Sequence, residues 1–337
     1  MLRIEADVLI PGLGDPIKDG ALVVDGTTIA YAGPIEGAPS AAGAVVLNVP
    51  ALMPGMWDVH GHFMGIRTLN VEEIARTPLA VLAARATKDA EVAVSAGFTS
   101  IRELSGLGVY LARVVAEGTV RGPHIYGAGG ALSQTGGHGD LHSFPLDFIQ
   151  EVLRRTGFSY LCDGVPECLK GVRMQLRVGA RVIKVLASGG VASELDHPVH
   201  AQFSREELEA IVSEAARADR VVAAHCHGKP GIMAALRAGC RTIEHGTFLD
   251  EEAADLMRER DAILVPTRFI IERLVRVGKE AGIAAYAYRK AVAINEQHQK
   301  ALRIAIRKGV RMATGSDIFA SAGGPAGWGL KIGRAHV

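Results

Sequence analysis

Short apolar runs alternate with amphipathic segments along most of the chain. Runs rich in Val, Ile and Ala have the length and composition of strands that are buried on both faces. We expect such strands at 53–59, 99–104, 124–127, 182–187, 221–225, 242–245, 263–266 and 311–315. Apolar residues recur at helical spacing between them, and we expect helices at 83–94, after the capping box Ser204–Glu207, at 251–260 and at 283–306. Eight strands alternating with helices favour an α/β fold of the (β/α)8 TIM-like barrel type.

Residues 1–52 have a different pattern. Apolar and β-branched runs at 7–11, 21–24, 28–32 and 44–49 are separated by turn signals such as Asp25-Gly26 and Gly33-Pro34. The segment is small for an independent all-β domain. We therefore expect two parts, a small β segment over 1–52 that packs on or pairs with another element, and the barrel over 53–330. A glycine-rich phosphate loop after the first barrel strand is missing, which removes support for a dinucleotide-binding sheet.

The last seven residues, 331–337, resemble the translation of a sequencing-library adapter. We expect them to be a non-native tail, and His336 is left out of the candidate ligands. The natural chain is then expected to continue beyond about Leu330.

Composition and charge exclude several classes of partner. The 37 basic and 36 acidic residues give a net charge of +1, and aromatic residues make up only 5%, so nucleic acid is not an expected ligand. An apolar run of membrane-spanning length and a signal-peptide core are both missing. The four cysteines have no CxxC spacing and indicate reduced thiols in a cytoplasmic protein. We expect a small-molecule substrate and leave a homo-oligomer open.

Polar residues follow or interrupt the apolar strands at a few positions only. His60 and His62 are two residues apart at the end of the first strand, so their side chains point the same way in extended chain. In a barrel, the carboxyl ends of the strands meet at one face, where active sites lie. The residues expected there are His60, His62, Lys184, His225, His245 and Asp317.

Lys184 is the most informative of these residues. It stands between Ile183 and Val185 in a buried strand, where an unpaired ammonium is costly. Burial and nearby metal charge would lower its pKa, and a neutral amine can react with carbon dioxide to give an anionic carbamate that bridges two metals. The alternative is a lysine that reaches solvent or a carboxylate.

Two further strand-end histidines suit the same chemistry. His225 and His245 would lie on adjacent strands and fit imidazole ligation of zinc. His227 shares a face with His225, which places it near either the metal or the substrate. Asp317 could bind a metal and exchange a proton with a bound water.

The combination of these motifs resembles the binuclear metal-dependent amidohydrolase superfamily. The similarity rests on Pro54-Gly55-x-x-Asp58-x-His60-x-His62, Lys184, His225, His245 and Gly315-Ser316-Asp317. Three longer segments, 133–140, 183–190 and 243–250, are similar to the imidazolonepropionase-related branch with its Xaa-Pro dipeptidases, N-acyl-amino-acid carboxypeptidases and ochratoxinase-like enzymes.

The resemblance implies a domain organisation, a ligand set and a reaction. Residues 1–52 would form a small, incomplete N-terminal β-sandwich, and the barrel over 53–330 would lack the last helix that the family has after the eighth strand. His60, His62 and Asp317 would hold one divalent ion, His225 and His245 a second, and carboxylated Lys184 would bridge both, with zinc the expected metal. A hydroxide bridging the ions would attack the amide carbon of a small acyl-amino-acid or dipeptide-like substrate. Asp317 would transfer the proton, and His138 would polarise the carbonyl or contact the substrate. Many peptidase members have tyrosine where this chain has His227, so the resemblance leaves the substrate open.

Three alternatives remain at this stage. A mononuclear deaminase or cyclic-amide hydrolase would use the same histidines and Asp317 without Lys184. A metal-binding protein without catalytic activity is the second, although the presence of Asp317 argues against it. The third is an inactive fragment of a longer enzyme.

Overall fold

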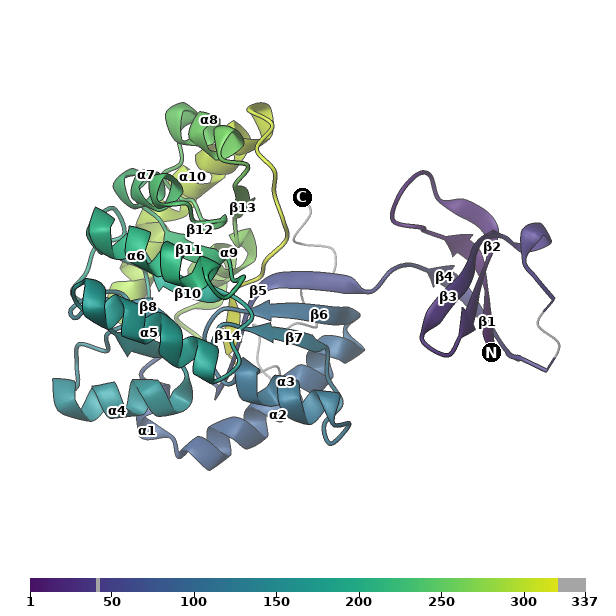
Figure 1. Cartoon of the computed structure of the whole chain (residues 1–337), viewed down its shortest axis with the longest axis horizontal. Coiled ribbons are helices and arrows are strands. Elements are labelled where there is room, and N and C mark those ends of the chain that lie inside the picture. The colour runs from purple at the N-terminus through teal and green to yellow at the C-terminus, as the bar shows by residue number, and fades with distance from the viewer. Residues whose placement is uncertain (41–42, 321–337) are drawn as a thin grey trace. The chain divides into compact units, whose positions relative to one another are not determined.

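The computed structural model describes residues 1–40 and 43–320. The chain divides into two compact units, Met1–Met56 and Trp57–Val337 (Figure 1). The tail expected at 331–337 and the missing last helix lie outside the described residues, and both stay predictions.

The first unit contains a four-stranded sheet with the order β3-β2-β1-β4. Its strands are β1 (Leu2–Leu9), β2 (Ile17–Asp25), β3 (Thr28–Pro34) and β4 (Val45–Leu52), with a 3-10 turn, η1 (Ile35–Gly37), after β3. The bounds expected for the first strand, 7–11, were wrong. Leu2, Ile4 and Ala6 alternate with the charged residues Arg3 and Glu5, so the beginning of β1 is not a continuous apolar run. The two charges pair with each other at 2.7 Å on the other face of β1. A β-sandwich would require a second sheet and stays a prediction.

The second unit is built on parallel strands. They form one sheet of order β14-β5-β6-β7 and another of order β13-β12-β11-β10-β8-β9. The strands are β5 (Met56–Ile66), β6 (Phe98–Glu103), β7 (His124–Gly127), β8 (Ala131–Ser133), β9 (Ser159–Leu161), β10 (Ile183–Leu186), β11 (Val222–Cys226), β12 (Thr242–His245), β13 (Ile263–Val265) and β14 (Ile318–Ala320).

Hydrogen bonds outside the regular ladders close these sheets into a ring. Arg181 N donates to Gly127 O at 2.8 Å, which joins the start of β10 to β7. On the other side, Leu264 N donates to Arg311 O and Val59 N donates to Thr314 O, both at 2.9 Å, so residues 311–314 run between β13 and β5 as the eighth strand. The expected barrel is confirmed, although 311–315 is irregular rather than a continuous strand.

Helices lie outside the strands (Figure 1). Their bounds are α1 (Glu73–Arg76), α2 (Leu79–Ser95), α3 (Gly108–Ala116), α4 (Leu146–Thr156), α5 (Val165–Arg177), α6 (Arg205–Ala216), α7 (Lys229–Ala238), α8 (Glu251–Glu259), α9 (Arg268–Val277) and α10 (Ala285–Arg307). The Ser204–Glu207 capping box forms as expected, and the Asp250 side chain caps α8. Within the described ranges, none of the helices is long and apolar enough to cross a membrane.

The main core lies between the strands and the outer helices. Leu208 and Ile211 of α6 and Met257 of α8 are completely buried there, against strand residues such as Ile183 and Ile243. The helices that carry these residues were expected from the helical spacing of apolar residues, one after the Ser204–Glu207 capping box and one at 251–260. All four cysteines are free and buried.

Candidate metal centre

Strand β5 places His60 and His62 on the wall of a pocket. Their ring centroids are 5.2 Å apart, and both side chains are at most 9% exposed. The sequence predicted a strand ending at residue 59, whereas β5 continues to Ile66. The extension forms because β14 pairs with this part of β5, through Ile318 with Gly61 and Ala320 with Ile66.

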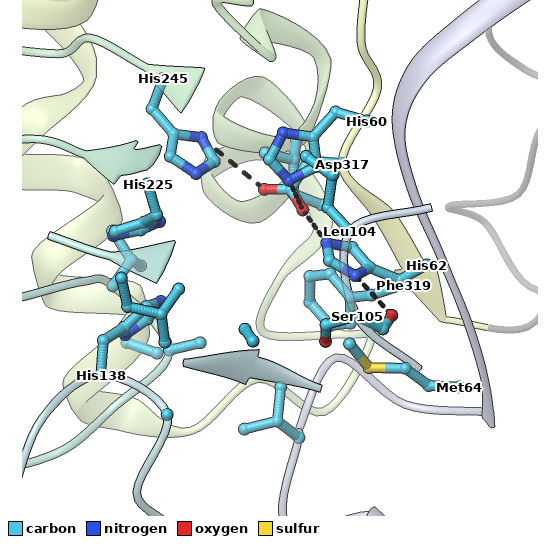
Figure 2. Close-up of a pocket in the computed structure, with 18 of the residues that line it drawn as sticks. His60, His62, Met64, Leu104, Ser105, His138, His225, His245, Asp317 and Phe319 are labelled. Carbon is cyan, nitrogen blue, oxygen red and sulfur yellow. Dashed lines mark hydrogen bonds and ion pairs between the residues drawn. The ribbon is translucent and has the colours of Figure 1, made fainter. Parts of the chain in front are cut away.

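Asp317 brings the first group of side chains together. Its Oδ1 lies 3.0 Å from His62 Nε2 and 3.5 Å from His60 Nε2, and its Oδ2 lies 3.9 Å from His245 Nδ1. Figure 2 shows His60, His62 and Asp317 on one side of the pocket, opposite His225, His245 and His138. One carboxylate and the histidines around it form a donor set that zinc and similar ions accept.

The second group is made of imidazoles. His225, His227 and His245 each offer a ring nitrogen, and these three atoms lie within 4.8 Å of one another. In the first group, a ring nitrogen of His60, a ring nitrogen of His245 and a carboxylate oxygen of Asp317 lie within the same distance of one another. The ring of His138 stacks on that of His225 with centroids 4.3 Å apart. The structure thus brings together the expected histidines, and it places His227 among the possible ligands as well as near the substrate space.

Lys184 of β10 lies on the same pocket wall with only 2% of its surface exposed. Within residues 1–40 and 43–320 its ammonium has no hydrogen bond or ion pair. Burial, the largest effect, lowers its pKa from 10.5 to about 8. A buried lysine without a partner beside two clusters of ligand-type side chains fits a residue that becomes an anion and receives metal.

Burial also favours the neutral, metal-binding form of His60, His225, His227 and His245. It lowers the pKa of His60 to about 4 and that of His227 to about 3, with Lys184 adding to the effect at His60. The pKa values of His225 and His245 lie well below 6.5 for the same reason. For Asp317, burial raises the pKa, but His60, His62 and Lys184 outweigh it and keep the carboxyl ionised.

A buried carboxylate behind His60 was missed by the sequence analysis. Glu244 Oε2 lies 2.7 Å from His60 Nδ1, and Arg102 donates to Glu244 Oε1 at 2.7 Å. Arg102 also donates to the Val59 carbonyl at 2.6 Å, so β6 ties β12 to β5 beneath the ligands. Glu244 could have been found by the signal that revealed Lys184, a charged residue inside a short apolar strand.

Other ligand-type histidines are also oriented through Nδ1. His62 Nδ1 lies 2.9 Å from the Ser105 carbonyl, and His245 Nδ1 lies 2.6 Å from Thr267 Oγ1. His227 Nδ1 lies 2.7 Å from Thr247 Oγ1. The Ser105 carbonyl can only accept, so His62 Nδ1 carries a hydrogen, and Nε2, 3.0 Å from Asp317 Oδ1, is the nitrogen directed toward the ligand cluster.

Three residues at this site have a strained backbone. His245, Thr267 and Asp317 have φ values of 70°, 48° and 57°, in the left-handed region that non-glycine residues rarely occupy. Threonine is particularly disfavoured there because it is β-branched. Such conformations persist only where the surrounding structure holds them, and they are typical of functional sites.

The pocket above these residues is largely apolar, and its space, including the part that is open to solvent, amounts to about 900 Å³. One wall comes from α9, from α10 and from the segment between them. The apolar lining residues are Met64, Leu69, Val71, Leu104, Ala131, Phe158, Leu186, Val191, Ala192, Ile270, Ile271, Leu274, Ile283, Ala287 and Phe319. Apolar walls around a few converging polar groups are typical of small-molecule sites.

Comparison with known proteins agrees with this geometry. A model described as the amidohydrolase family matches residues 51–328. The chain belongs to the amidohydrolase family. Ochratoxinase of Aspergillus niger is 41% identical over 98% of this chain and 71% of its own length.

Solved amidohydrolase structures have the same fold. The crystal structure of A. niger ochratoxinase covers 96% of this chain and 77% of its own, with a TM-score of 0.87 and 40% identity. A prolidase in complex with N-methylphosphonate-L-proline has a TM-score of 0.89 at 33% identity, and the match covers 95% of this chain and 79% of that one. A Xaa-Pro dipeptidase with bound methionine has a TM-score of 0.83 at 30% identity, covering 95% and 80%.

Membership in this family confirms the expected class of protein. This amidohydrolase is an enzyme, and its reaction is the metal-dependent hydrolysis of an amide bond. Its described residues include two groups of His and Asp side chains arranged for metal binding.

Proposed function

We propose that this amidohydrolase cleaves the amide bond of a small acyl-amino-acid or dipeptide-like substrate with a large apolar acyl group, using two divalent ions. Unpartnered Lys184 is the observation that carries the proposal. It acts electrostatically on His60 and Asp317 of the first group and on His225 of the second, as expected of a side chain that serves both.

The donor set divides as the family resemblance implied. His60, His62 and Asp317 would hold one ion, His225 and His245 the other, and carboxylated Lys184 both. Zinc is the proposed metal because neutral imidazoles and carboxylates are its ordinary ligands. When bound, two such ions supply a lowered pKa for water and Lewis-acid polarisation of the carbonyl.

Asp317 is the residue proposed to move the proton. Its lowered pKa keeps it a carboxylate, so it can accept a proton from the attacking water and pass it to the leaving nitrogen. One water is consumed, and a carboxylic acid and an amine are released. His138 and His227, which line the pocket, are proposed to contact the substrate.

The substrate class follows from the pocket lining. Among the described residues of this lining, Lys184 is the one lysine and arginine is missing, while apolar side chains form most of the wall. Such a pocket favours a bulky apolar or aromatic acyl group over a small charged dipeptide. We therefore propose a substrate preference nearer to that of ochratoxinase than to those of the prolidase and the Xaa-Pro dipeptidase among its relatives.

A hydrolysis screen with the zinc-loaded protein tests the proposal. The substrates are ochratoxin, N-aroyl and N-acetyl amino acids, and Xaa-Pro dipeptides, with release of the free amine as the readout. We expect the aromatic acyl substrates to be cleaved with the highest kcat/KM and Asp317→Asn to be inactive on all of them. Equal turnover by Asp317→Asn, or a preference for small dipeptides, would contradict the assignment.

The cytoplasm remains the proposed compartment, supported by the four free cysteines. The proposed partner is the small-molecule substrate.

A further inference from the structure

The loop that follows β10 contains a buried carboxylate surrounded by donors. The Asp196 side chain is 5% exposed. Its Oδ2 accepts from Gly190 N at 2.9 Å and from Gln202 Nε2 at 3.3 Å, and its Oδ1 accepts from Lys290 Nζ at 3.1 Å and from the Ser193 hydroxyl. A carboxylate with four donors is fully satisfied as an anion and has no proton to give.

The position of the Ser193 proton follows from this arrangement. A serine hydroxyl has one hydrogen, and the Asp196 carboxylate can only accept it. Ser193 Oγ also lies 2.7 Å from His138 Nδ1. Since its own hydrogen is directed at Asp196, Ser193 can only accept in this second bond, and His138 must donate from Nδ1.

In the neutral form of His138, the state of the other nitrogen is defined too. Neutral imidazole carries one hydrogen, so an Nδ1–H tautomer leaves Nε2 with a lone pair. Within the described part of the chain Nε2 has no hydrogen-bond partner, and His138 lines the pocket. A neutral His138 thus offers the pocket an acceptor, whereas polarising a carbonyl oxygen would require a donor.

Two features hold the ring in this place. Lys290, which reaches across from α10, donates to the carbonyls of Ser193 at 2.7 Å and Asp196 at 2.6 Å and so anchors the loop. A Cβ built on Gly190 would lie 2.0 Å from His138 Cε1, so the close approach of loop and ring requires glycine.

We infer that Asp196 and Ser193 are positioning residues that set the tautomer of His138, with Lys290 anchoring them, so that Nε2 accepts an N–H or O–H group of the substrate. The inference rests on the proposed function only in treating the bound molecule as the substrate, because the tautomer of His138 is a property of the substrate-free protein. It narrows the favoured substrates to amides with an N–H near the scissile bond, because proline amides and N-methyl amides lack one.

Nitrogen NMR of the ring tests the tautomer without reference to activity. Zinc-loaded protein labelled with 15N-histidine is compared with His138→Gln to assign the His138 ring signals. We expect the protonated shift at Nδ1 and the unprotonated shift at Nε2. In Asp196→Ala the Ser193 hydroxyl becomes free to donate, and we expect the two shifts to exchange. Ser193→Thr should keep the original pattern, since it keeps the hydroxyl.

Kinetics then tests the consequence at the substrate. An N-aroyl amino acid is compared with its N-methyl derivative, and we expect the wild type to prefer the N–H substrate at least tenfold, mainly in KM. Asp196→Ala and Lys290→Met should reduce this preference, and Ser193→Thr should retain it. Lys229→Met, which removes an ion-paired lysine of α7, is the matched control for Lys290→Met.

The outcomes separate the two proposals. A wild-type His138 with a protonated Nε2, or an Asp196→Ala protein with unchanged shifts, would overturn the inference whatever the enzyme hydrolyses. The expected shifts in a protein that cleaves none of the amides would support the tautomer and overturn the proposed function instead.

Discussion

Glu244 Oε2 lies 2.7 Å from His60 Nδ1, and both side chains are at most 1% exposed. A carboxylate in this position accepts a hydrogen bond from His60 Nδ1–H and directs Nε2 toward Asp317 Oδ1, 3.5 Å away. Arg102 keeps Glu244 ionised by lowering its pKa, against the effect of burial. The orientation of the first histidine is therefore set by side chains from two other strands, β6 and β12.

Replacement of Glu244 by Gln should weaken metal binding. We expect about a 10- to 100-fold loss of zinc affinity, because an amide no longer stabilises the ligating imidazole. Competition with a chromophoric chelator measures the affinity, and a melting curve checks that the protein is folded. Exposed Glu259→Gln is the control. An unchanged affinity in folded Glu244→Gln would show that the contact does not act on the metal.

Replacement of Lys184 by Ala should remove metal and activity together. The loss follows if Lys184, once carboxylated, is shared by both ions. Metal analysis of the wild type should give close to two ions per chain, and the variant close to none. One ion per wild-type chain would favour the mononuclear alternative. Full activity of Lys184→Ala with two ions bound would exclude the bridging role, and exposed Lys88→Ala serves as the control.

Loading of the metal-free protein should depend on pH through Lys184. Burial disfavours the ammonium, so the proton leaves as pH rises through about 8. Only the neutral amine reacts with carbon dioxide, and its fraction increases from roughly 3% at pH 6.5 to roughly 50% at pH 8. At constant dissolved carbon dioxide, we expect recovery of activity with zinc to be about fifteenfold faster at pH 8. A rate that is flat over this interval would contradict the assignment.

A second buried carboxyl should affect stability rather than metal binding. Burial raises the pKa of Glu103 from 4.5 to about 7, and its Oε2 has no hydrogen-bond partner in the described part of the chain. Between pH 4.5 and pH 7 the folded state therefore holds a proton that the unfolded state has lost. The stability that this proton contributes is complete below pH 4.5 and is lost as the pH rises to 7. The loss amounts to about 3 kcal/mol.

Glu103→Gln lacks this titration. Urea unfolding of metal-free protein at pH 5 and pH 8 should show that the variant gains stability relative to the wild type at the higher pH. Exposed Glu117→Gln should follow the wild type. If Glu103→Gln and the wild type depend on pH identically, the carboxyl titrates normally.

The sequence alone predicts those parts of the fold and of the site that depend on local patterns of residues. Apolar runs of strand length marked the barrel strands, and the Ser204–Glu207 capping box marked the start of α6. Polar residues at strand ends are conspicuous because so few interrupt these runs. That contrast explains why His60, Lys184 and Asp317 were found and why the structure brings them together.

The features of the fold and site that the sequence does not predict depend on contacts between segments that are distant in the chain. Glu244 and His60 are 184 residues apart, so nothing local pairs them. β8 and β9 are three residues each, too short for a periodic signal, and residues 311–314 form a strand only through hydrogen bonds to β13 and β5. The donors around Asp196 come from its own loop and from α10, and only the folded chain shows them.

The apolar wall of the pocket has a separate origin from the groups expected to do the chemistry. The ligand-type side chains belong to strands and strand ends, whereas Ile270, Leu274, Ile283 and Ala287 belong to α9, α10 and the turn between them. Selectivity can therefore change by substitution in one helical hairpin while the ligand residues stay the same. A variant library restricted to these four positions offers a direct route to new acyl preferences in this scaffold.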